Sequence, residues 1–134
     1  MLPPLPLRDL DLSDTGAGLR AVVLISLPGG QLRDAWLATG QPDRTHDVAS
    51  WLGVMLEAHH NLLGVLSAPH DDSWTVIESS HTLAIVRQFR IDFALGAVFG
   101  PEATQGAARL TMRKLIKHLD SLLPSDQPIE VDDI

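Results

Sequence analysis

The fold is decided by residues 74–99, which read WTVIESSHTLAIVRQFRIDFALGAVF. This stretch divides into three runs rich in β-branched and apolar residues, at 74–79, 82–89 and 91–99, and such runs are typical of β-strands. The junctions between them are short. They therefore predict antiparallel pairing, because a parallel connection needs a dozen residues or more. Residues 91–99 are apolar at nearly every position, which predicts a central strand covered on both faces.

Two more strands are expected before this stretch. Residues 21–27 read AVVLISL, and a run this apolar predicts another buried strand. Pro28-Gly29-Gly30 predicts a tight turn, since proline fixes φ and glycine accepts a positive φ. Residues 32–39 then predict the second arm of a hairpin.

Residues 47–66 have the spacing of a helix, which Asp43 or Thr45 can cap. Apolar residues cover more than half of its circumference, whereas a helix that covers one sheet needs only a narrow stripe. We therefore expect this helix to meet a second surface as well. Its main apolar arc consists of Val48, Trp51, Leu52, Met55, Leu62, Leu63 and Leu66.

A last helix is expected to start at Gly100-Pro101-Glu102 and to end before Pro124. Residues 108–123 are amphipathic, with a basic outer face that includes Arg109, Arg113 and Lys117. This face can bind an acidic partner, a phosphate or the acidic tail that follows it. The simplest interpretation is a solvated surface.

The resulting order is β-β-α-β-β-β-α. Strands that are apolar on both faces need helices on both sides, so we predict an α/β fold with three layers, α/β/α. The domain spans residues 18–123. We expect residues 1–17 to be a proline-rich leader, disordered or extended through residue 7, followed by a weak first helix. Residues 124–134 are expected to form an acidic tail.

Composition narrows the classes of function. A chain of 134 residues fits one domain, and a net charge of −7 disfavours general binding to nucleic acid. The absence of cysteine excludes a disulfide framework, a thiolate zinc site and a cysteine nucleophile. There is neither a signal-peptide pattern nor an apolar run of about 20 residues, the length needed to span a membrane. We therefore expect a cytoplasmic protein with no membrane insertion.

The segment GLRAVVLISLPGGQ at residues 18–31, the long helix, and the block from Trp74 to Ala103 together resemble the roadblock/dynein light chain domain family, in its bacterial MglB-like and MglC-like branch. The resemblance covers residues 18–123. It implies a roadblock/longin-like five-stranded antiparallel sheet in the order 2-1-5-4-3. It also implies homodimers, or heterodimers with a paralogue, in which the third strands pair and the long helices pack together. Family members of this branch modulate Ras-like small GTPases or act as scaffolds for paralogues.

Two sets of candidate site residues follow from this resemblance and from the helical spacing. The expected dimer interface consists of Trp74, Val76, Ile77, Trp51, Met55 and His59. The expected partner-binding surface is a polar arc of the long helix, formed by Ser50, Gly53, Glu57, His60, Asn61 and Gly64.

No catalytic, cofactor-binding or metal-binding residue is predicted. The sequence has no phosphate-binding glycine-rich loop with its lysine and no G-x-S-x-G nucleophile motif. His59 and His60 are adjacent and point about 100° apart on a helix, so they cannot share one metal ion. The triplet His70-Asp71-Asp72 is interpreted as a solvated turn.

We therefore expect a non-enzymatic regulatory dimer that binds a Ras-like small GTPase, in a setting such as cell polarity or gliding motility. One alternative is a scaffold that binds a roadblock paralogue without contacting a GTPase. A second is a small-molecule sensor domain of the PAS or GAF type, built from similar α/β parts.

Overall fold

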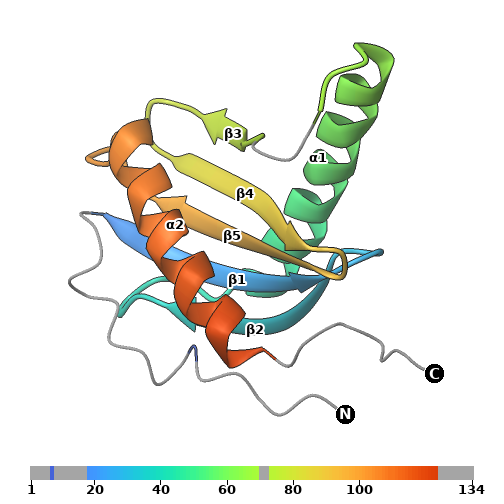
Figure 1. Cartoon of the computed structure of the whole chain (residues 1–134). Coiled ribbons are helices and arrows are strands. Elements are labelled where there is room, and N and C mark those ends of the chain that lie inside the picture. The colour runs from blue at the N-terminus through green and yellow to red at the C-terminus, as the bar shows by residue number, and fades with distance from the viewer. Residues whose placement is uncertain (1–6, 8–17, 70–72, 124–134) are drawn as a thin grey trace.

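A computed structural model describes residue 7, residues 18–69 and residues 73–123. Five of its seven elements are strands in one antiparallel sheet, in the order β2-β1-β5-β4-β3. Helix α1 covers one face of this sheet and helix α2 covers the other, which confirms the three predicted layers (Figure 1). The elements, in chain order, are β1 (Leu19–Ser26), β2 (Gln31–Leu37), α1 (Thr45–Val65), β3 (Thr75–Glu78), β4 (Leu83–Arg90), β5 (Phe93–Phe99) and α2 (Gln105–Leu122).

Two element boundaries differ from the prediction for a clear physical reason. β5 begins at Phe93 because Ile91 and Asp92 form the turn after β4, and the Ile91 side chain is 81% exposed. α2 begins at Gln105, where the hydroxyl of Thr104 accepts the Ala107 N–H at 3.2 Å. This hydroxyl satisfies one of the free amides at the helix start, so Thr104 is the cap. The expectation that the helix starts at residues 100–102 was therefore wrong.

Asp43, one of the two predicted capping residues, holds the first residue of α1, but the cap position itself is Arg44, whose side chain forms no capping hydrogen bond. The Asp43 carboxylate accepts both the backbone N–H of Thr45, at 3.2 Å, and its hydroxyl, at 2.7 Å. The helix then packs on β-strand residues through a narrow strip of buried side chains, and Leu52 lies over Gly96 in β5. A β-carbon on Gly96 would come within 2.5 Å of a Leu52 methyl group, so the Leu52 side chain would have to shift if residue 96 carried one. The buried residues of α1 are Thr45, Ala49, Leu52 and Leu56.

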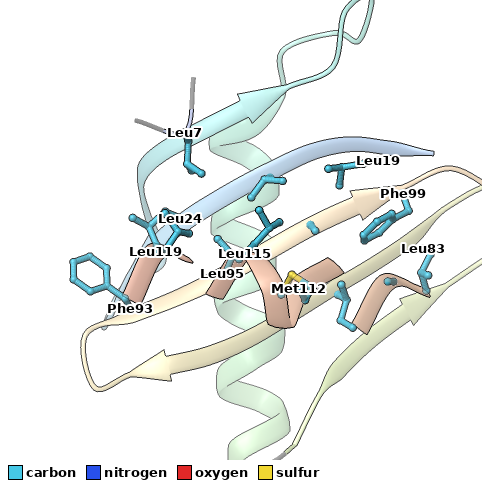
Figure 2. Close-up of a cluster of buried hydrophobic side chains, with 14 of the residues drawn as sticks. Leu7, Leu19, Leu24, Leu83, Phe93, Leu95, Phe99, Met112, Leu115 and Leu119 are labelled. Atoms are coloured by element: carbon cyan, nitrogen blue, oxygen red, sulfur yellow. The ribbon is translucent and has the colours of Figure 1, made fainter. Parts of the chain in front are cut away.

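The larger hydrophobic cluster lies between the sheet and α2 (Figure 2). It includes Leu7, whose side chain is fully buried and whose N–H donates to the Asp34 carboxylate of β2 at 3.2 Å. The leader that was expected to be disordered or extended is thus packed at Leu7, which the sequence did not reveal because an isolated leucine beside prolines has no periodicity. The expected first helix and the acidic tail lie outside the described residues.

Arg90, at the end of β4, holds the C-terminal end of α2. Its Nε donates to a carboxylate oxygen of Asp120 at 2.7 Å. Its Nη2 donates to the backbone carbonyls of Asp120, at 2.9 Å, and Leu123, at 3.4 Å. The last carbonyls of a helix have no partner within the helix, and a guanidinium supplies one here. The position at which the chain leaves α2 is thereby fixed.

Candidate functional site

The buried strip of α1 divides the rest of the helix into two flanks. At about 100° per residue, Trp51, Met55, His59 and Leu62 lie on one side of that strip. Ser50, Gly53, Glu57 and His60 lie on the other side. The predicted dimer residues of α1 and the predicted partner-binding residues are thus on opposite flanks. The buried strip lies at one edge of the main apolar arc, so Trp51 and Met55, which belong to that arc, are exposed in the described chain.

The apolar flank is large and continues to the end of the helix. Trp51 is 68% exposed, and the last turns carry Leu62 at 58% and Val65 at 81%. No residue after Leu56 belongs to the buried strip, and the C-terminal half of α1 extends beyond the sheet past β3 (Figure 1). Isolated exposed apolar side chains are common, but a contiguous set on one helix is typical of an interface.

Strand β3 lies beside this overhang at the edge of the sheet, where β4 is its one neighbour among the described strands. Its residues divide between the two faces. Ile77 pairs with Ala84 and so lies on the α1 side of the sheet, where it is 40% exposed. Trp74 and Val76 are partly buried and pack against the cluster under α2. The six predicted dimer residues therefore do not form one patch on the α1 face, since four lie on that face and two on the other.

His59 is the polar member of the apolar flank. Its side chain is half-buried, and its Nε2 atom is buried without a hydrogen-bond partner among the described residues. The ring of His60 lies edge-on to it, with the ring centroids 6.0 Å apart. A buried nitrogen without a partner is unfavourable, so a donor or acceptor supplied by another molecule would stabilise this position.

The opposite flank of α1 borders a hollow of about 350 Å³. Four of the six predicted partner-binding residues line it, namely Gly53, Glu57, His60 and Asn61. Ser50 and Gly64 do not. The far wall of the hollow is formed by parts of the chain that the sequence did not mark as functional. These are the turn Pro28-Gly29-Gly30, and Gln88 and Ile91 at the β4–β5 turn.

The far wall has a defined shape because its turn is braced. The Gln88 side-chain amide donates to the backbone carbonyls of Arg90, at 3.0 Å, and Ile91, at 3.2 Å. The exposed Ile91 side chain is therefore presented on a fixed hairpin beside the polar arc of α1. The sequence held a usable signal for this wall, since the turn after β1 and the turn before β5 must lie at the same end of an antiparallel pair.

Comparison with solved structures identifies the fold. The chain aligns with a gliding protein MglB from Thermus thermophilus with a TM-score of 0.73 and 19% identity, over 89% of this chain and 90% of that one. A roadblock/LC7 domain from Streptomyces avermitilis aligns at 0.69 and 20%, over 87% and 93%. MglC from Myxococcus xanthus aligns at 0.55 and 17%, over 82% and 91%.

The chain has the roadblock/LC7 fold. The resemblance seen in the sequence is confirmed at the level of structure. No protein-family model matches the sequence, and no curated protein matches it significantly. At this low identity the roadblock fold is shared while the surface residues are this chain's own, so the site has to be argued from its own side chains.

Within residues 18–69 and 73–123, no group of three or more histidine or carboxylate side chains is placed to hold a metal ion. The triplet His70-Asp71-Asp72 lies outside the described residues. Neither described helix is long and apolar enough to cross a bilayer.

Proposed function

We propose that the protein is a non-enzymatic regulatory dimer that binds a Ras-like small GTPase through the flank of α1 that carries the hollow. The observation that carries the dimer is the exposed apolar flank of α1 beside the β3 edge of the described sheet. Pairing of two β3 edges would satisfy their free backbone groups, and two overhanging helices would cover each other's apolar side chains. One of the similar solved structures is described as "MglB with tetrameric arrangement", which is consistent with self-association.

The proposal that the partner is a GTPase rests on the family resemblance. The residues of α1 indicate how this protein would regulate it. Helix α1 has no lysine or arginine between Thr45 and Val65. The flank therefore has no cation to place on a developing phosphate charge, which is how an arginine finger accelerates hydrolysis. Regulation would come from shape, with Ile91, Glu57 and Asn61 holding the partner's mobile segments in one conformation.

The dimer is tested by light scattering on Leu62→Lys/Val65→Lys. We expect a folded monomer, because two charges on the overhang would be buried without partners in the dimer. Leu110→Lys is the matched control, since Leu110 is 52% exposed but lies on α2, on the other side of the sheet. A double variant that remains dimeric at micromolar concentration would contradict the proposed interface.

GTPase binding is tested by calorimetric titration of a Ras-like GTPase from the same organism, loaded with GDP or with a non-hydrolysable GTP analogue. Glu57→Lys/Asn61→Arg reverses the charge of the hollow's rim without touching Gly53, and we expect at least tenfold weaker binding. Ser50→Arg is the control on the same flank, outside the hollow. An unchanged affinity in the folded double variant would place the partner elsewhere.

The alternative is a scaffold that pairs with a roadblock paralogue through the same apolar flank. Two observations support this scaffold alternative. The chain is similar to MglC, and the buried Nε2 atom of His59 has no hydrogen-bond partner within the described chain. A heterodimer that forms at a lower concentration than the homodimer, with no binding of any GTPase, would support the scaffold.

A further inference from the structure

A second hollow lies on the opposite face of the molecule, between β4 and α2. Its volume is about 340 Å³. Phe89 and Ile116 supply apolar side chains, and Arg87, Arg113 and Lys117 supply cationic ones. Asp120 stands at the end nearest the C-terminus of α2. We refer to these six residues as the basic groove. Gln88 borders both hollows, whereas none of these six residues belongs to the α1 overhang or lines the first hollow.

Two of the three cations of the basic groove, Arg87 and Arg113, lie against the same aromatic ring, that of Trp74. The guanidinium carbon of Arg87 lies 4.5 Å from the ring centroid of Trp74, and that of Arg113 lies 5.7 Å from the same ring. Two guanidinium groups against one indole make this end of the groove strongly positive. Arg113 and Lys117 are exposed, and neither forms an ion pair within residues 18–69 and 73–123. The groove therefore favours an anionic occupant that also has apolar side chains.

The carboxylate of Asp120, at the other end of the groove, does not repel such an anionic occupant. Asp120 is paired with Arg90 at 2.7 Å, so its charge is already compensated. Arg90 also holds the carbonyl of Leu123, the last described residue, so the described chain ends next to the Asp120 end of the groove. The chain that follows has the matching chemistry. It carries Asp126, Glu130, Asp132 and Asp133 without any lysine or arginine, and Pro128, Ile129 and Val131 lie among these acids.

The segment after Leu123 is also long enough to reach the cations of the basic groove. Along the axis of α2, Lys117 lies about 9 Å and Arg113 about 15 Å before Leu123, at 1.5 Å per residue. Glu130 to Asp133 follow Leu123 by seven to ten residues, which extend to about 23–33 Å. A segment that turns back at Pro124 thus reaches both cations with several residues to spare.

We propose that residues 124–134 dock on the basic groove of their own chain, with Glu130, Asp132 and Asp133 against Arg113 and Lys117. The acidic segment then covers a strongly cationic surface of an otherwise acidic protein. Binding of this kind is weak for each pair and is screened by salt, so the docked state is expected to dominate at low ionic strength and to open as salt rises.

The proposal is tested by paramagnetic relaxation in the full-length protein. The sequence has no cysteine, so Ile134→Cys carries a spin label at a single position. At about 20 mM salt we expect strong broadening of the backbone amides of residues 113–117 and of Phe89. At about 0.5 M salt, where the Debye length falls to a few ångströms, this broadening should largely disappear.

Two lysines on the same helix supply the matched control. Lys117→Glu should abolish the broadening, because Lys117 lines the groove, whereas Lys114→Glu should preserve at least half of it, because Lys114 is exposed outside the groove. Asp132→Lys/Asp133→Lys should also release the segment. Combining this pair with Arg113→Glu/Lys117→Glu should restore docking.

Three results would overturn the proposal. One is the absence of broadening at residues 113–117 at low salt in a protein whose circular dichroism shows that it is folded. Another is equal loss in Lys114→Glu and Lys117→Glu, which indicates unspecific attraction. The third comes from mixing spin-labelled chains at natural isotope abundance with ¹⁵N-labelled chains that carry no spin label. Broadening at the full strength of the single-species sample would then place the segment on another copy.

Discussion

Gly53 of α1 lies so close to Gly30 of the β1–β2 turn that a β-carbon on Gly53 would come within 2.8 Å of the Gly30 Cα atom. Helical spacing alone predicted that Gly53 lies on an open polar arc. The structure places it in contact with backbone, where two glycines allow the helix to approach the turn. Gly53 still borders the hollow, but a bulky residue there would displace the helix as well as block a partner.

Gly53→Ala is expected to lower the free energy of unfolding by up to about 2 kcal/mol. The clash is with backbone, which cannot rotate away, and overpacking of this kind costs about 1–3 kcal/mol against a gain in helix propensity of about 1 kcal/mol. Gly64→Ala is the matched control, since a β-carbon there would meet nothing within 4 Å, and it should raise stability by up to about 1 kcal/mol. Urea unfolding curves measure both. Stabilisation of both variants would show that the close contact between Gly53 and Gly30 does not limit the side chain at residue 53.

Leu7→Ala is expected to destabilise the fold by about 2–4 kcal/mol, because it empties a fully buried site in the core. Leu110→Ala removes the same atoms from a half-exposed position on α2 and should change stability by less than about 0.5 kcal/mol. Thermal melting of the two variants gives the comparison. A Leu7 variant that melts with the wild type would show that residue 7 is dispensable for the core.

Gly96→Ala is expected to cost about 1–3 kcal/mol, because the new methyl group would overlap the Leu52 side chain. Leu52→Ala should cost about 2–4 kcal/mol by itself. The double variant should be more stable than the sum of the two losses predicts, by at least about 1 kcal/mol, since each change makes room for the other. Additive losses in a double-mutant cycle would mean that the two residues do not share this space.

Arg90→Met is expected to destabilise the protein by about 1–2 kcal/mol, because it removes the donor for two helix carbonyls and one carboxylate. Asp120→Asn keeps the carbonyl contacts and loses only a partly exposed ion pair, so its cost should stay below about 1 kcal/mol. Hydrogen exchange of the last turn of α2 should accelerate in the first variant and change little in the second. Equal effects would show that the ion pair dominates.

The sequence predicted the strands and helices well, because apolar runs and short junctions restrict the pairing. It could not place Ile91, since an apolar residue next to an apolar strand has the same pattern whether it lies in the strand or in the turn. The sequence did not reveal that Leu7 is buried in the core, because a single apolar side chain shows no periodicity. The wall of the hollow at Pro28–Gly30 and Gln88 depends on which strand ends lie together under α1, and spacing along one helix does not contain that information.

The overhang of α1 has a mechanical consequence. From Leu56, its last buried residue, to Val65 the helix runs about 13 Å, and along it His59, His60 and Leu63 are only half-buried. Nearer its start the helix is held close to the sheet, where Gly53 meets the backbone of Gly30. Glu57, His60 and Asn61, which line the hollow, belong to the less buried half of α1. A molecule that binds the end of α1 is therefore expected to alter the shape that the hollow presents to a third molecule.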